Sequence, residues 1–323
     1  MAKEIYTPRG IRNPKLLKEF GQNGRYKSLL EIVANDPDLD LQIRSDYVNI
    51  YYRGHNLAKI ESPHGAVQFS EFYFLCKDMI PDVPGIDGKH HVNVKGDKKR
   101  NIPQQTEIIT KLREKRDGLK SIFKKSDYKT YIAKAKKQMD LWLSDFPKPE
   151  REEQHKIVKS NTQPGAEFTI IDIEFQTSVL APYAYTPESP KDSRKSTRLD
   201  IIAVDKQGQL YVIELKKGCG ACEGKSGLAD HLKSFNNSVG RAPKEFLKDM
   251  AFLLKQKQEF GIIKDASLKI DESKDPCFVF GYAPNKDNTE TIGQFEELCR
   301  NEKVGSVPIL ECKSDHTLTL YKA

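Results

Sequence analysis

The sequence predicts an α/β protein whose C-terminal domain contains a mixed sheet flanked by helices, preceded by a smaller α+β domain. Residues 197–216 have the pattern of two apolar strands joined by a polar turn. Two amphipathic helical patterns come later, at 243–260 and 289–301, and each is followed by an apolar strand. Adjacent strands followed by alternating helices and strands favour a mixed sheet that helices cover.

The N-terminal part is predicted to combine helices with a hairpin. Residues 14–33 show helical spacing of apolar residues, with Leu29 and Val33 on one face. The stretch 41–60 changes to strand character, and its polar centre at 53–56 is typical of a hairpin turn. The remaining predicted elements of this part are a strand at 66–74 and helices at 104–123 and 127–146.

The C-terminal part is predicted to begin with a helix. Pro149 and the acidic residues that follow it are typical of a first helical turn. An apolar strand at 168–176 precedes the hairpin, whose turn falls at 206–209. The elements expected after the hairpin are helices at 224–235, 243–260 and 289–301 and strands at 275–282, 307–310 and 318–321.

Length and composition favour a two-domain globular protein. A chain of 323 residues exceeds one typical core, and the prolines at 147 and 149 suggest domains at 1–147 and 148–323. No apolar run reaches the roughly 18 residues that a membrane span needs. The N-terminus lacks an apolar secretory core. We therefore expect a cytoplasmic protein without a membrane partner.

The cysteines indicate a reducing compartment. Cys219 and Cys222 form the single CxxC pattern among six scattered cysteines. A structural zinc site normally requires a second pair at comparable spacing. Free thiols are therefore the expectation.

Positive charge is concentrated in one segment. Residues 95–137 contain 15 Lys and Arg against 5 Asp and Glu, a net of +10, whereas the whole chain carries +7. Such a segment suggests a polyanionic partner, most simply the phosphate backbone of a nucleic acid, although a solvated helix face would explain part of it. Lys98, Lys99 and Arg100 lie in a predicted loop, from which they could contact phosphates.

Three residues of the hairpin carry the strongest functional signal. Side chains alternate along a strand, so Glu214 and Lys216 point to one face of the second strand. The hairpin can bring Asp200 back beside Glu214. Mg²⁺ prefers carboxylate and carbonyl oxygens, and two carboxylates next to an ammonium group suit metal-assisted attack of water on a phosphodiester. A surface ion pair between Glu214 and Lys216 is the ordinary alternative.

The constellation resembles the signature of the PD-(D/E)XK nuclease superfamily, which has a restriction-endonuclease-like fold. The resemblance covers residues 148–240, and Leu199 stands where the family often has proline. It implies a nuclease whose Mg²⁺ or Mn²⁺ is held by Asp200, Glu214 and the backbone carbonyl of Leu215. Lys216 would then orient the attacking water or hold the phosphate.

The resemblance also nominates further members of the site. The family usually has a glutamate on the helix before the first core strand, and Glu150 fits this place better than Glu153. Acidic residues in a first helical turn also stabilise the helix without any other role. Glu174 on the strand before the hairpin could approach the metal, or belong to a solvent-facing acidic row with Asp172 and Gln176.

A helix after the signature often supplies another side chain to sites of this family. His231 is the candidate there, although a single histidine on a helix more often has a structural role. Arg198, just before Asp200, is a candidate for binding nucleic acid. DNA is the expected substrate, RNA is not excluded, and a homodimer is possible because many family members cut two strands. A catalytically inactive nucleic-acid-binding module and a protein-interaction module are the alternatives.

Overall fold

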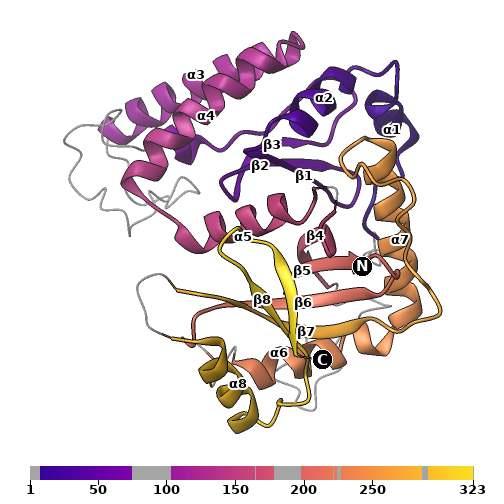
Figure 1. Ribbon diagram of the computed structural model, residues 1–323. Coiled ribbons are helices and arrows are strands. Elements are labelled where there is room, and N and C mark those ends of the chain that lie inside the picture. Colours follow the sequence, from indigo (N-terminus) through magenta and orange to yellow (C-terminus); the bar gives the residue numbers. More distant parts are fainter. Residues whose placement is uncertain are drawn as a thin grey trace, which may run out of the picture. The chain divides into compact units, whose positions relative to one another are not determined.

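The protein is an α/β protein with a six-stranded mixed sheet, a three-stranded antiparallel sheet and surrounding helices (Figure 1). Its structure is a computed structural model, which describes residues 8–74, 103–163, 165–177, 198–220, 222–223, 227–285 and 290–322. It divides into two compact units. The first unit is Ile11–Glu152, and the second is Glu153–Ala323 together with the described residues of Met1–Gly10. The sequence-based boundary lies at residue 148, a few positions earlier.

The first unit consists of helices packed with the three-stranded sheet. Its elements are α1 (Pro14–Phe20), α2 (Lys27–Asn35), β1 (Leu39–Ile43), β2 (Val48–Tyr52), β3 (His55–Ile60), the 3₁₀ helix η1 (Glu71–Phe74), α3 (Pro103–Lys124) and α4 (Tyr128–Asp145). The strands follow the order β1-β2-β3 and are antiparallel. Arg53 and Gly54 join β2 to β3 with φ of 48° and 75°, as a two-residue primed turn requires.

Aromatic side chains form much of the core of the first unit. Tyr26, Phe123, Tyr128 and Tyr131 are fully or almost fully buried, and their rings pack at centroid distances of 4.9 to 6.3 Å. The hydroxyl of Tyr131 donates to the backbone carbonyl of Leu57 at 2.9 Å, which satisfies the polar end of a buried ring. The β2–β3 hairpin, α3 and α4 therefore share one apolar core.

The strand predicted at residues 66–74 is wrong. Gln68 forms an isolated antiparallel bridge with Lys59, and the chain then turns into η1. Phe69, Tyr73 and Phe74 are buried, as a strand would also allow. The spacing of four between Phe69 and Tyr73, whose rings lie 5.2 Å apart, fits one turn of helix rather than an extended chain.

The second unit is built on the six-stranded sheet, with the order β4-β5-β6-β7-β8-β9. Neighbours from β6 to β8 are parallel and the other pairs are antiparallel, so the sheet is mixed, as predicted. Its elements are β4 (Phe168–Gln176), β5 (Arg198–Asp205), β6 (Leu210–Lys217), α6 (Leu228–Asn236), the 3₁₀ helix η3 (Val239–Arg241), α7 (Pro243–Glu259), β7 (Cys277–Ala283), α8 (Ile292–Asn301), β8 (Ile309–Cys312) and β9 (Leu318–Lys322).

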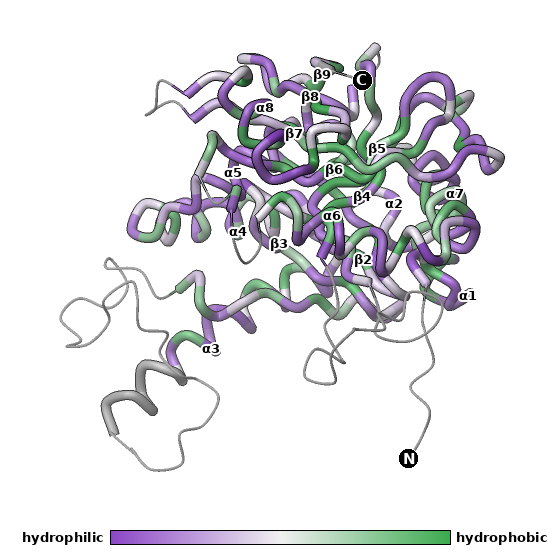
Figure 2. Tube along the Cα trace, turned by 90° about the horizontal axis from the view of Figure 1, so that it is seen from below, coloured by the Kyte–Doolittle hydropathy of each residue, from purple (hydrophilic) through white to green (hydrophobic). Residues whose placement is uncertain are grey.

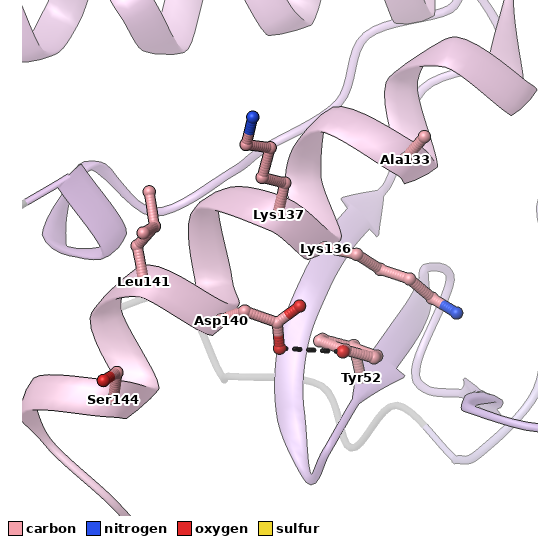
Figure 3. Close-up of a pocket in the computed structure, with 7 residues that line it drawn as sticks. All are labelled: Tyr52, Ala133, Lys136, Lys137, Asp140, Leu141 and Ser144. Atoms are coloured by element: carbon pink, nitrogen blue, oxygen red, sulfur yellow. Dashed lines mark hydrogen bonds between the residues drawn. The ribbon is translucent and has the colours of Figure 1, made fainter.

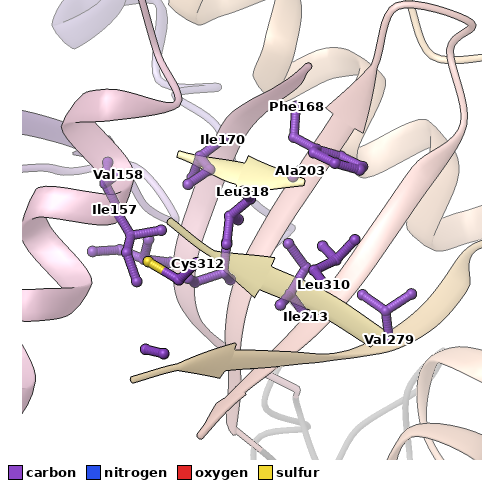
Figure 4. Close-up of a cluster of buried hydrophobic side chains, with 13 residues drawn as sticks. Ile157, Val158, Phe168, Ile170, Ala203, Ile213, Val279, Leu310, Cys312 and Leu318 are labelled. Atoms are coloured by element: carbon purple, nitrogen blue, oxygen red, sulfur yellow. The ribbon is translucent and has the colours of Figure 1, made fainter. Parts of the chain in front are cut away.

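One face of this sheet forms the main apolar core. Helix α5 (Pro149–Ser160) packs Ile157 and Val158 against Ile201, Ile213 and Val279 of the central strands (Figure 4). We call this side the α5 face. Figure 2 shows hydrophobic residues along β5 and β6. Central strands that are buried on both faces of a sheet consist of long apolar runs, because burial of apolar side chains on each face stabilises the fold.

The opposite side of the sheet is covered by α6 and α8 (Figure 1), and we call it the α6 face. Phe278 and Phe280 alternate with Val279 on β7, so they point away from the α5 face. Phe278 packs on Phe235 of α6 at 5.1 Å, and Phe280 packs on Phe295 of α8 at 6.4 Å between ring centroids. Among the described helices, none is long and apolar enough to cross a membrane.

Candidate active site on the α6 face

The β5–β6 turn fixes which residues of the two strands face each other. The carboxylate of Asp205 accepts hydrogen bonds from the backbone N–H groups of Gln207 and Gln209, both at 2.9 Å, and Gly208 adopts a φ of 78°. The paired register then runs from Val204 opposite Leu210 to Ile201 opposite Ile213. Asp200 and Glu214 come directly after the last pair, one on each strand.

Asp200 is held at this position by two hydrogen bonds. Its Oδ2 accepts from the backbone N–H of Leu215 at 3.1 Å, and its backbone carbonyl accepts from Nε2 of Gln154 on α5 at 3.2 Å. Burial, and then the negative charge of Glu214, raise the pKa of Asp200 to about 7. The two carboxylates are therefore close enough to repel each other in a site with little water.

Glu214 is the most buried charged group of the site, with 4 % of its surface exposed. Its Oε1 lies 3.2 Å from Nζ of Lys216 and 3.1 Å from Nε2 of His231. Lys216 is also buried. A buried carboxylate requires such partners because an uncompensated charge in the interior is costly. The Glu214–Lys216 pair is thus an interior pair rather than a solvated surface pair.

Helix α6 brings His231 to the site through its apolar stripe. Leu228 and Phe235 are buried, and His231 lies three residues after the first and four before the second, on the same face of the helix. Packing of that face against the sheet directs the imidazole toward Glu214. The sequence nominated His231 as a lower-ranked candidate, and the structure places it in contact with a principal one.

Glu174 and Arg198 pair with each other. Oε1 of Glu174 lies 3.2 Å from an Nη of Arg198, and the Glu174 backbone carbonyl accepts from an Nη of Arg9 at 3.2 Å. Glu174 has a φ of 46°, so regular strand geometry is interrupted at this residue. Arg198 exposes 61 % of its side chain at the start of β5. It therefore presents positive charge next to Asp200.

The acidic row considered for β4 does not form, because Asp172 is fully buried. A register shift between Ile170 and Asp172 changes the alternation of the strand. Oδ2 of Asp172 lies 3.0 Å from Nε of Arg9, a residue from the N-terminal end of the chain. Glu174 is half-buried and Gln176 is exposed. The three side chains thus have three different environments.

The two candidate glutamates of α5 have different positions. Glu150 is exposed in the first turn and belongs to the first unit. Glu153 belongs to the second unit, and its Oε1 lies 2.7 Å from Nδ1 of His316. Gln154 is the described α5 residue that contacts Asp200. Sequence reasoning missed it, although Gln154 precedes Ile157 and Val158 by one helical turn and so shares their buried side.

The basic loop nominated for phosphate contacts, Lys98, Lys99 and Arg100, lies outside the described residues. Within the described part of the basic segment, some of the lysines pair with acidic side chains. Lys136 of α4 pairs with Asp36 at 2.8 Å and Asp38 at 3.1 Å. Part of this charge is thus neutralised within the first unit.

An open pocket of about 450 Å³ lies in the first unit between α4 and β2 (Figure 3). The residues that line it are Tyr52, Ala133, Lys136, Lys137, Asp140, Leu141 and Ser144. The hydroxyl of Tyr52 donates to Asp140 at 2.8 Å, and Arg53 also donates to Asp140, at 3.1 Å. The carboxylate of this pocket is thus held by side chains of β2 and of the β2–β3 turn.

The donor set on the α6 face fits a hard divalent cation. Asp200 and Glu214 offer carboxylate oxygens from facing strands. The N–H and C=O of one strand residue point to the same edge, so the carbonyl of Leu215 is on the edge that its N–H shares with Asp200. A cation among these oxygens would offset the burial and the repulsion by Glu214 that raise the pKa of Asp200.

Comparisons of the chain with family models, with curated protein sequences and with solved structures gave no significant match. The function is therefore argued from the geometry of the α6 face and from its electrostatics. Fold class alone would not decide it, because one architecture supports many activities.

Proposed function

We propose that the second unit is a Mg²⁺-dependent nuclease with a restriction-endonuclease-like arrangement, and that it hydrolyses phosphodiester bonds, most simply those of DNA. The observation that carries this proposal is the position of Asp200 and Glu214. They face each other just beyond the last backbone pair of β5 and β6. The Lys216 ammonium group lies 3.2 Å from Glu214.

Asp200, Glu214 and the Leu215 carbonyl would hold Mg²⁺ or Mn²⁺. The ion supplies charge neutralisation at the phosphate and a bound water of lowered pKa. These three groups supply only part of an octahedral shell, which leaves positions for water and for a phosphate oxygen.

The ammonium group of Lys216 is suited to hold the scissile phosphate. It is buried and reaches the site from the same strand and the same face as Glu214. A lysine is a compact point charge with three donors, so it can contact a phosphate oxygen and the attacking water together. Its pairing with Glu214 keeps that charge in place before substrate arrives.

His231 acts as a positioning residue in this proposal. Its contact with Oε1 of Glu214 at 3.1 Å fixes the rotation of that carboxylate. Second partners of this kind commonly orient the ligands of a metal. Arg198 is exposed two residues before Asp200, and it would contact a flanking phosphate in this proposal.

Cleavage of plasmid DNA, single-stranded DNA and RNA by the full chain, with Mg²⁺, with Mn²⁺ and with a chelator, tests the proposal. We expect metal-dependent cleavage that is lost in Asp200→Ala and in Lys216→Ala. Lys206→Ala, a substitution of an exposed lysine in the β5–β6 turn, is the matched control and should cleave normally. Cleavage that persists in both site variants rejects the assignment. Salt-sensitive binding without cleavage by the wild type would instead support an inactive nucleic-acid-binding module.

A further inference from the structure

A cluster of side chains of metal-ligating types lies in the second unit, apart from the Asp200 carboxylate. Glu153 comes from α5, Cys312 ends β8, and His316 lies in the turn between β8 and β9. One donor atom from each residue, an oxygen, a sulfur and a nitrogen, lies within 4.8 Å of the other two. Glu153 is far in the sequence from Cys312 and His316, so the fold itself brings the carboxylate to the thiol and the imidazole.

Each donor is fixed by the surrounding structure. Cys312 is 1 % exposed and belongs to the apolar core of the α5 face, and Figure 4 shows its sulfur on the side of Ile157. Ile157 follows Glu153 by one turn of α5, which places the carboxylate near the sulfur. His316 Nδ1 lies 2.7 Å from Glu153 Oε1.

The turn that carries His316 is attached to α5 by Asn161, which is fully buried. Nδ2 of Asn161 donates to the carbonyl of His316 at 2.8 Å, and its Oδ1 accepts from the N–H of Leu318 at 2.9 Å. The backbone on both sides of the imidazole is therefore positioned before any ligand binds. Preorganised donors of this kind lose little entropy on binding.

We propose that Glu153, Cys312 and His316 bind a transition-metal ion of the zinc class. Thiolate, imidazole and carboxylate are the ligand set that Zn²⁺ takes, whereas Mg²⁺ requires oxygen ligands. Ligand atoms bonded at about 2.0 to 2.3 Å to a tetrahedral ion lie about 3.3 to 3.8 Å apart. Small shifts of the three side chains would therefore suffice, including a slight widening of the 2.7 Å between His316 Nδ1 and Glu153 Oε1. A water would supply the fourth ligand.

This site is distinct from the one on the α6 face. Cys312 belongs to the cluster of the α5 face, whereas Glu214 and Lys216 alternate with Ile213 and point to the other side of the sheet. The bound ion would join α5 to the β8–β9 turn. It would therefore stabilise the second unit without entering the proposed cleavage reaction.

Titration of the reduced, metal-free full chain with Co²⁺ tests this inference. A Co²⁺–thiolate bond gives a charge-transfer absorption in the near ultraviolet, which oxygen ligands do not give. We expect this band in the wild type and in Asp200→Ala, and we expect Cys312→Ser to lose it. The control is the double substitution Cys219→Ser with Cys222→Ser, which removes the CxxC pair. This variant should retain the band.

His316→Gln keeps the test decisive if Cys312→Ser does not fold, because His316 is less buried. The apparent affinity of His316→Gln for Co²⁺ should be at least about tenfold weaker than that of the wild type. Absence of the band in the folded wild type overturns the inference. Persistence of the band in Cys312→Ser, or its loss in the double control, also overturns it, because the ion would then be bound by other thiols.

Discussion

Oδ2 of Asp200 accepts a hydrogen bond from the backbone N–H of Leu215 at 3.1 Å, at the point where the β5–β6 ladder ends. A side chain thus takes the place of the next backbone acceptor. The contact keeps the Asp200 carboxylate next to Glu214 although their charges repel. An asparagine at position 200 can accept the same bond through its amide oxygen, so Asp200→Asn separates the charge of the site from its geometry.

The first prediction concerns stability and pH. The folded-state pKa of Asp200 is raised from 3.8 to about 7, so the metal-free native state holds this proton more tightly than the unfolded state. Stability therefore falls as pH rises from about 4 to about 7 and stays low above that range. The shift corresponds to at most about 4 kcal/mol, and partial exposure reduces it to about 1 to 3 kcal/mol.

Urea unfolding at pH 5 and pH 8 without divalent ions measures this effect. The wild type should lose free energy of unfolding between the two conditions, and Asp200→Asn should lose less. Addition of Mg²⁺ at pH 8 should restore stability to the wild type alone. Equal losses in the two proteins would show that Asp200 does not titrate in this window.

The second prediction concerns the affinity for the metal. Binding of Mg²⁺ requires the ionised form of Asp200, whose pKa is about 7 in the metal-free protein. Below that pH, protons compete with the ion, so the apparent affinity should fall about tenfold for each further pH unit. Calorimetric titration with Mn²⁺ at pH 6 and pH 8 measures the difference. An affinity that is independent of pH would argue against Asp200 as a ligand.

The third prediction concerns His231. Removal of the imidazole frees the Glu214 carboxylate to rotate, so His231→Ala should lower metal affinity or cleavage about 10- to 100-fold. His231→Gln, which can still donate to Glu214, should recover part of the loss. Lys233→Ala, an exposed residue of the same helix, is the control. A thermal melt that is unchanged in His231→Ala, together with weaker Mn²⁺ binding, separates positioning from a structural role.

The fourth prediction concerns the ion pair between Arg9 and Asp172. Arg9→Ala leaves the carboxylate of Asp172 in the interior without this cation, which should destabilise the second unit by about 3 to 5 kcal/mol. Replacement of Asp172 by Asn in the same chain should recover part of that loss. Arg12→Ala, a substitution of an exposed arginine nearby, is the control. Denaturant titration measures the free energy of unfolding of the wild type and the three variants. An unaltered midpoint in Arg9→Ala would show that the pair contributes little.

Local patterns predicted most helices, the β5–β6 hairpin and the mixed sheet. The turn at Asp205 and the alternation of Glu214 with Ile213 are properties of neighbouring residues, so the facing of Asp200 and Glu214 could be inferred. Features that depend on distant segments could not. The burial of Asp172 rests on a bulge and on Arg9, and the contact of Gln154 with Asp200 joins two elements.

The same limit applies to the second cluster. Sequence reasoning sought zinc ligands in two pairs of cysteines at short spacing, and the sequence has one such pair, Cys219 and Cys222. Cys312 and His316 are near each other in the sequence, but their third partner, Glu153, lies on a helix that begins before the first strand of the sheet. Tertiary packing alone brings it there.

Residues 8–10 pack with the second unit, so they are synthesised well before the strands that they contact. Arg9 leaves the ribosome long before Glu174, which follows it by 165 residues and whose carbonyl it contacts. The intervening Ile11–Glu152 unit can fold first, before β4 has been synthesised and can contact Arg9. A fragment that starts at Glu153 would lack that arginine altogether, so the early segment has to be supplied in any attempt to isolate the sheet.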